Sequence, residues 1–166
     1  MSEVILAINR MESDGIVGGY AIGGAVAAAF YIESVSTIDV DIFVTFTQPG
    51  PLISLEPVFS YLKDLGCSMQ DEYVLIGGWP VQFLPPINAL VEEAMLQFRR
   101  ISVEGVMAKV FSAEHLAAIA LQTRRSKDLH RLQDFLDSGV LDLVLFVEIL
   151  TRHGLLESWE KFRSQH

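Results

Sequence analysis

The sequence predicts an α/β (α+β) protein with a short mixed sheet in the first two-thirds of the chain and a helical C-terminal part. Residues 38–46 alternate apolar and polar side chains, which is the period of a strand with one buried face. A short apolar segment, residues 20–22, leads into two glycines and an alanine-rich stretch that favours a helix. From Ser112 onward the apolar residues recur only at helical spacing.

The part before residue 112 is expected to alternate helices with short strands. Ser2 and Ser54 each precede an apolar periodic stretch, so both are predicted helix N-caps. Two glycine-containing pairs, at 77–78 and 104–105, each separate two apolar runs and predict hairpins. In chain order the predictions are helix 2–11, strand 20–22, helix 25–31, strand 38–46, loop 48–51, helix 54–65, strands 73–76 and 81–84, helix 88–100, and strands 101–103 and 106–111.

The part after residue 111 is predicted to contain helices alone, at 113–123, 127–136, 141–152 and 155–162. The chain therefore divides into an α/β domain, residues 1–111, and a helical subdomain, residues 112–166. The apolar stripe of the last two helices is expected to be mostly core. Part of it is a candidate surface for a homodimer or another protein partner.

Composition excludes several classes of protein. The chain has 166 residues, of which 51% are apolar, so it can build one core and is not intrinsically disordered. A net charge of -9 disfavours DNA binding, because nucleic-acid affinity comes mainly from neutralised phosphates. The single cysteine, Cys67, cannot form an internal disulfide, which fits a cytoplasmic location. Residues 15–32 carry no charge but are too rich in glycine for a membrane helix, so no membrane span is expected.

Two pairs of residues carry the candidate chemistry. Gly23 and Gly24 end a strand and open a helix, where the backbone can approach a phosphate closely. Asp39 and Asp41 are two residues apart on the next strand, so alternation puts both carboxylates on one face, where they can share a divalent cation. A hard cation held by carboxylates beside a phosphate site is what phosphoryl or nucleotidyl transfer requires. Two plainer interpretations stay open: tight helix–strand packing at the glycines, and a solvated strand face at the aspartates.

This arrangement resembles the nucleotidyltransferase fold shared by DNA polymerase β, kanamycin nucleotidyltransferase and the minimal nucleotidyltransferases. Their signature is an apolar residue, Gly, Gly or Ser, a spacer, then Asp-x-Asp or Asp-x-Glu, and Gly23, Gly24, Asp39 and Asp41 stand at those positions. Segments 31–37, 80–85 and 121–128, the last with a Lys-Asp pair opening a helix, resemble a bacterial branch near the abortive-infection type II toxins. The resemblance covers residues 16 to about 137.

The resemblance implies a sheet of the nucleotidyltransferase type and a transfer of NMP from a nucleoside triphosphate that depends on Mg²⁺ or Mn²⁺. It implies that Asp39 and Asp41 are the catalytic, metal-holding pair. The residues that it implies for nucleotide or phosphate binding are Gly23, Gly24, Thr37, Lys127 and Arg124.

One position departs from the family pattern. Active members usually carry a third acidic residue on a later strand, and the matching residue here is Gln82. An amide has no negative charge and cannot take a proton at neutral pH. Glu33 and Asp71 are candidates to replace the missing carboxylate, and Glu33 and Gln82 are expected near the pocket. Trp79, Pro80 and Tyr73 either line a pocket beside Gln82 or, as the favoured interpretation, pack in the core or at its rim.

Two further interpretations stay open. A catalytically degenerate member of the fold would bind a nucleotide or a protein partner without turnover, as in a toxin–antitoxin pair, and Gln82 favours this alternative. The cluster of basic residues near the start of the helix at 127 is either a triphosphate clamp or a solvated helix start in which Arg125 and Arg131 pair with nearby aspartates. The four histidines lack ligand spacing and are not expected to bind a metal.

Overall fold

The structure is a computed structural model of the chain and describes residues 1–33, 35, 37–47 and 54–165. The helices are α1 (Ser2–Ser13), α2 (Gly24–Ala28), α3 (Glu56–Asp64), α4 (Ala89–Leu96), α5 (Ala113–Thr123), α6 (Ser126–Ser138), α7 (Leu143–Arg152) and α8 (Leu156–Gln165). The strands are β1 (Gly19–Ile22), β2 (Val40–Thr45), β3 (Ser68–Gln70), β4 (Tyr73–Ile76), β5 (Trp79–Leu84), β6 (Arg99–Val103) and β7 (Val106–Val110). The predicted loop at 48–51 lies outside the described residues.

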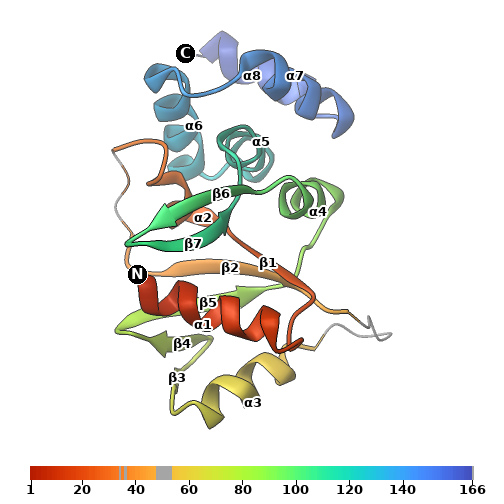
Figure 1. Cartoon of the computed structure of the whole chain (residues 1–166). Coiled ribbons are helices and arrows are strands. Elements are labelled where there is room, and N and C mark those ends of the chain that lie inside the picture. The colour runs from red at the N-terminus through yellow and green to blue at the C-terminus, as the bar shows by residue number, and fades with distance from the viewer. Residues whose placement is uncertain (34, 36, 48–53, 166) are drawn as a thin grey trace.

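The strands of the described residues form one mixed sheet in the order β3-β4-β5-β2-β1-β7-β6. Strand β2 is antiparallel to β1 and parallel to β5, and β1 is parallel to β7. The predicted hairpins β4–β5 and β6–β7 are confirmed. Figure 1 shows α1 across one face of the sheet, α3 beyond the β3 end, and α5–α8 together beyond the β6–β7 end. The predicted fold class, a mixed sheet followed by helices, is confirmed.

Strand β2 is the central element for the candidate site. Its apolar residues Val40, Ile42 and Val44 are fully buried, whereas the alternate residues on the other face are half-buried. The prediction that Ile38 belongs to the buried face is wrong, because its side chain is 83% exposed. Pairing with β5 begins only at Val40, so residue 38 lies before the sheet.

Several predicted helix ends are wrong. Ser2 is already helical and Met1 is the N-cap of α1, without a side-chain cap. Helix α3 begins at Glu56, although the Ser54 hydroxyl accepts a hydrogen bond from the Glu56 N–H (3.2 Å). The predicted helix 25–31 is shorter, since α2 ends at Ala28, and the predicted helix 88–100 ends at Leu96 because β6 takes its last residues.

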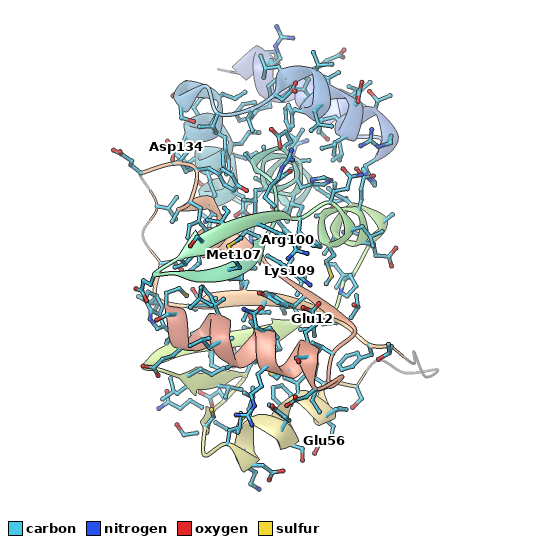
Figure 2. All side chains as sticks on the ribbon, in the orientation of Figure 1. Glu12, Glu56, Arg100, Met107, Lys109 and Asp134 are labelled. Atoms are coloured by element: carbon cyan, nitrogen blue, oxygen red, sulfur yellow. The ribbon has the colours of Figure 1, made fainter. Side chains whose placement is uncertain are left out.

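Helix α1 is held on the sheet by an apolar face and by an ion pair. Val4, Ile5, Ile8 and Met11 are buried, as expected for an amphipathic surface helix. At its C-terminal end Glu12 binds the ammonium group of Lys109 from β7 (Figure 2). Within the described residues no helix has the length and apolar character needed to cross a membrane.

The C-terminal helices are joined to the rest of the chain through α5. The Ser112 hydroxyl caps α5 by accepting from the His115 N–H (3.3 Å), and α5 contacts α2 and α4 as well as α6 and α7. One hydrophobic cluster contains buried residues from both sides of the predicted boundary. The division at residue 111 into two domains therefore stays a prediction.

Glu93 on α4 links three helices. Its carboxylate accepts hydrogen bonds from Arg152 Nη2 (2.7 Å) and His153 Nε2 (2.9 Å) near the end of α7, and lies 3.2 Å from His115 Nε2 of α5. The hydrogen bond from Arg152, with those from the two histidines, outweighs partial burial and lowers the pKa of Glu93 to about 2. Both histidines thus have structural partners.

Candidate active site

Gly24 lies directly against the carboxylate of Asp41. Strand β1 ends at Ile22, and the Gly23 N–H donates to the Asp41 carbonyl (2.9 Å), which fixes this turn beside β2. Gly24 has φ +59°, and a Cβ built there would lie 1.9 Å from Asp41 Oδ2. Any other residue would therefore displace the carboxylate or be displaced by it.

Asp41 lies on β2, whereas Asp39 precedes the strand by one residue and does not line the cavity that Asp41 lines. The prediction that the two carboxylates share one strand face therefore stays a prediction. Burial raises the pKa of Asp41, and the negative charge of Asp39 raises it further. Part of this rise is offset by cationic side chains at the start of α6: Lys127, Arg131 and Arg125. Asp39 Oδ1 accepts a hydrogen bond from the Thr37 hydroxyl (2.8 Å), whereas the Asp41 carboxylate has no hydrogen-bond or ion-pair partner among the described residues.

Gln82 is the direct neighbour of Asp41 across the sheet. The parallel register of β2 and β5 pairs Asp41 with Gln82, so both side chains project from the same face. The described residues contain no group of three or more carboxylate, imidazole or thiol side chains arranged to hold a metal. Two carboxylates and an amide oxygen nevertheless are the hard oxygen donors that Mg²⁺ prefers, so this donor set fits a divalent cation that keeps ligands from water or phosphate.

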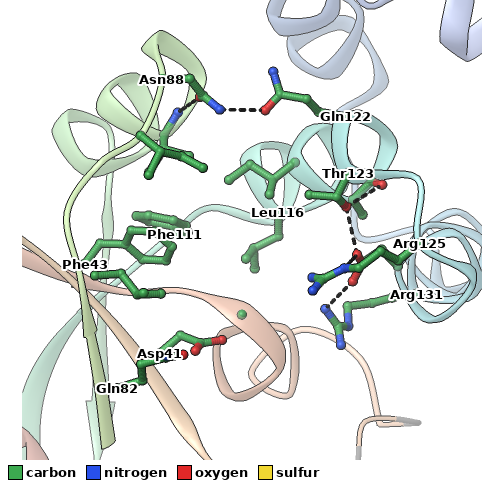
Figure 3. A pocket seen from close by; sticks show the side chains of 17 residues that line it. Asp41, Phe43, Gln82, Asn88, Phe111, Leu116, Gln122, Thr123, Arg125 and Arg131 are labelled. Carbon is green, nitrogen blue, oxygen red and sulfur yellow. Dashed lines mark hydrogen bonds and ion pairs between the residues drawn. The ribbon is translucent and has the colours of Figure 1, made fainter. Parts of the chain in front are cut away.

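A cavity of about 250 Å³ opens in front of these residues, between the sheet and helices α4, α5 and α6 (Figure 3). One side is polar and charged, and its residues are Asp41, Gln82, Thr123, Arg125, Asp128 and Arg131. The other side is apolar and includes Phe43, Leu84, Val91, Phe111, Leu116 and Ile119. The rings of Phe43 and Phe111 pack with centroids 5.0 Å apart. Figure 3 shows the hydrogen-bonded amides of Asn88 and Gln122 on the side opposite Asp41 and Gln82.

Asp128 organises the basic side of the cavity. It is 2% exposed and accepts hydrogen bonds from Arg125 Nε (2.5 Å) and the Thr123 hydroxyl (2.8 Å), with Arg131 Nη1 at 3.5 Å. Burial alone would raise the pKa of Asp128, but these bonds and charges outweigh it and lower the pKa. The interpretation that Arg125 and Arg131 pair with an aspartate is confirmed. Both guanidiniums also line the cavity, so the alternative interpretation of this cluster as a triphosphate clamp stays a prediction.

The residues expected to bind phosphate are only partly brought together. Gly24 lines the cavity, whereas Lys127 does not and reaches Asp41 only through its charge. Arg124 donates instead to the Ser158 hydroxyl of α8 (3.5 Å). Thr37 lines a different cavity, of about 390 Å³. Their roles in binding stay predictions.

The residues expected near Gln82 are only partly brought together. Glu33 and Asp71 are exposed and do not line the cavity, so neither stands in for the missing carboxylate in this structure. Trp79 lines the separate cavity that contains Thr37. Pro80 lies two residues before Gln82 on β5, and the antiparallel register of β4 and β5, continued by one residue, places Tyr73 opposite Gln82.

Tyr73 is also close to the two aspartates. Burial raises the pKa of Tyr73, and the negative charges of Asp39, Glu72 and Asp41 raise it further. Tyr73 and Pro80 thus lie beside Gln82 without lining the cavity itself, and their place as pocket walls stays a prediction.

Sequence reasoning missed the walls supplied by α4 and α5. Asn88 accepts the Val91 N–H (3.0 Å) as the N-cap of α4 and donates to Gln122 Oε1 (2.9 Å). An asparagine after Pro85–Pro86 signals a helix start, and that signal was available. Nothing in the sequence indicates that its amide meets α5.

Comparisons with known proteins agree on the fold. No protein-family model matches this sequence, and no curated protein sequence matches it significantly. Among solved structures, the chain is similar to an antigenic nucleotidyltransferase-like protein from Paracoccidioides brasiliensis, with a TM-score of 0.57 and 16% identity over 82% of this chain and 74% of that one. It is also similar to the crystal structure of ANT(2″)-Ia in complex with adenylyl-2″-tobramycin, with a TM-score of 0.51 and 16% identity over 90% of this chain and 97% of that one. The solution structure of the antibiotic-resistance factor ANT(2″)-Ia is similar with a TM-score of 0.53 and 14% identity over 99% of each chain. The chain therefore has the nucleotidyltransferase fold.

Proposed function

We propose that this chain binds a nucleoside triphosphate together with Mg²⁺ or Mn²⁺ in the cavity beside Asp41 and transfers NMP to an acceptor. The observation that carries the proposal is the Asp41 carboxylate. It lies beside a glycine that leaves no room for a Cβ, faces an open cavity, and has no partner among the described residues. A half-buried carboxylate without a partner is unfavourable unless a ligand satisfies it.

Asp39 and Asp41 are the residues that would hold the cation. A divalent ion supplies charge neutralisation and polarises a phosphoryl oxygen. The Thr37 hydroxyl orients Asp39 by donating to Oδ1, while Gly24 lets the loop before α2 approach Asp41 closely. The hydrogen bond therefore orients Asp39 before a ligand arrives, and the missing side chain at Gly24 leaves the Asp41 carboxylate its place.

The basic side of the cavity is suited to the phosphates. Arg125 and Arg131 are held by the buried Asp128, so their guanidiniums are oriented with little further loss of side-chain freedom. Lys127 adds positive charge near Asp41 without lining the cavity. The similar structure of ANT(2″)-Ia contains adenylyl-2″-tobramycin, a nucleotidylated small molecule, which supports nucleotidyl transfer as the reaction class.

Gln82 favours a second candidate function, in which the chain binds a nucleotide or a protein without turnover. The residue beside Asp41 cannot act as a base. In addition, Leu143, Val144 and Leu156 of the C-terminal helices are exposed by 57%, 72% and 38%, which suits contact with a partner or a second copy. A toxin–antitoxin pair of the kind found in the abortive-infection branch is the form such a partnership would take.

Two measurements separate these functions. Thermal unfolding is followed with ATP, GTP, CTP or UTP, with and without Mg²⁺. The proposal expects a stabilisation that requires the cation and disappears in the Asp39→Asn/Asp41→Asn variant. Asp137→Asn, an exposed change on α6, is the matched control and should keep the shift.

Transfer of label from an α-³²P-labelled triphosphate then distinguishes turnover from binding. Labelled acceptor with the unmodified chain, and none with the double variant, supports transfer. Labelling that survives in the double variant refutes the assignment of the site. A cation-dependent shift without any transfer supports the second candidate.

A further inference from the structure

The cavity contains no group that can deprotonate an attacking hydroxyl. Its titratable side chains, within the described part of the chain, are Asp41, Asp128, Arg125 and Arg131. The guanidiniums stay protonated, and Asp128 is occupied by Thr123 and Arg125. Asp41 is assigned to the cation in the proposed function. Among the residues that the structure describes, no histidine, lysine, tyrosine, cysteine or glutamate lines this space.

Gln82 occupies the place where such a base would act. It is paired in register with Asp41 and lines the same cavity. Its amide can donate and accept hydrogen bonds, so it can orient an acceptor oxygen, but it cannot remove a proton at neutral pH. An attacking alcohol would therefore remain neutral and a poor nucleophile in this cavity.

The charge around the cavity suits an anionic acceptor. Two guanidiniums line it, and only one carboxylate on its basic side, Asp128, faces them. With a divalent cation on Asp39 and Asp41, the aspartates no longer repel an approaching anion.

We infer that the acceptor attacks through an oxygen that is already an anion at neutral pH, the oxygen of a phosphomonoester or a carboxylate, and that alcohols are poor acceptors. This inference rests on the proposed function. A bond forms between the acceptor oxygen and the α-phosphorus, and the bond from that phosphorus to the bridging α–β oxygen breaks. Pyrophosphate leaves with the electron pair. No proton has to leave the nucleophile, because the pKa values of a phosphomonoester (second ionisation) and a carboxylic acid are about 6 and about 4, so both are anions at neutral pH.

The test compares small acceptors that need no specific recognition. The chain is incubated with a labelled triphosphate and Mg²⁺, and with methyl phosphate, acetate or methanol at equal concentration. Methyl phosphate gives a stable diphosphate diester, and acetate gives an acyl nucleotide that hydroxylamine traps, so the two oxyanion sources are distinguished by product. At least tenfold more product from one of the oxyanions than from methanol is expected.

A variant supplies the missing base. Gln82→Glu should raise transfer to methanol by about 100-fold, the lower range of what a positioned base contributes. Gln97→Glu adds the same charge at an exposed position outside the cavity and should leave methanol a poor acceptor.

Two outcomes overturn the inference while leaving nucleotide binding intact. One is transfer to methanol by the unmodified chain at a rate equal to that for methyl phosphate and acetate. The other is no product from either oxyanion in protein whose cation-dependent thermal shift is present. Absence of that shift is a separate result, because it refutes the proposed function.

Discussion

Replacing Gly24 with alanine puts a methyl group where the Asp41 carboxylate lies. The new Cβ would be 1.9 Å from Oδ2, 2.9 Å from Cγ and 3.1 Å from Cβ of Asp41. The residue would also have to keep φ +59°, a left-handed conformation that L-residues disfavour. Two separate penalties are therefore expected, one from the backbone and one from the clash.

Their size follows from the geometry. The left-handed conformation costs about 1–2 kcal/mol in a residue with a side chain, and forcing neighbouring atoms aside costs about 1–3 kcal/mol more. Gly139→Ala is the matched control, because Gly139 has φ +68° and nothing within 4 Å of the new Cβ. We expect the control to show the backbone penalty alone and Gly24→Ala to exceed it by the clash.

Urea denaturation measures both, and a double-mutant cycle isolates the clash. In an Asp41→Ala background the two closest contacts are gone and only the 3.1 Å contact remains, so Gly24→Ala should there cost about as much as the control. Equal losses in the two backgrounds would refute the reasoning. The same would hold if Gly24→Ala and Gly139→Ala were equally destabilising in the unmodified chain.

Three further predictions concern the supports of the fold. Glu93→Gln should lower the free energy of unfolding at pH 7 by about 1–3 kcal/mol. The pKa of Glu93 is lowered to about 2 in the folded chain. Its contribution to the free energy of unfolding is therefore fully present above the unfolded pKa near 4.5 and is lost as the pH falls from there toward 2. If variant and parent differ in stability by the same amount at pH 7 and pH 2.5, this reasoning is wrong. Asp128→Asn should cost about 1–3 kcal/mol in urea denaturation, because it weakens the hydrogen bonds that this buried carboxylate accepts from Thr123 and Arg125. Exposed Asp137→Asn should change stability by under about 0.5 kcal/mol; similar losses would count against the Asp128 cluster. Tyr31→Phe should lower the free energy of unfolding by about 1 kcal/mol, because the Phe111 carbonyl loses its 2.9 Å hydrogen bond. Burial raises the pKa of Tyr31 to about 12, so the variant should lack the phenol that titrates at this high pH in ultraviolet absorbance. A titration curve identical to that of the parent would show this assignment to be wrong.

Regular patterns made much of the fold predictable. The alternation in residues 40–45 and the glycines between short apolar runs reflect local geometry, so β2 and both hairpins were found. Strand β3 was missed because its three residues are all exposed and carry no apolar alternation. Helix α2 was predicted too long, because alanine content reports helix propensity and not where tertiary structure turns the chain.

The site was predictable only where it lies on one strand. Alternation in the sequence predicts Asp39 and Asp41 on one face, and the register of β2 and β5 brings Gln82 beside Asp41. The remaining walls come from α4, β7, α5 and α6, which meet only through packing. Lys127 shows the same limit within one helix. Asp128 and Arg131 are three residues apart and share a face, while Lys127 points about 100° away from Asp128.

Asp41, which has no partner among the described residues, and the nearby Asp39 also affect how the protein discriminates among ions. Their two like charges repel each other in the folded chain, whereas in the unfolded chain they move apart. A bound ion that relieves this repulsion therefore stabilises the folded state alone, and the relief grows with the valence of the ion. The protein would in this way prefer doubly charged over singly charged metals by electrostatics, even before coordination geometry selects among the divalent ones.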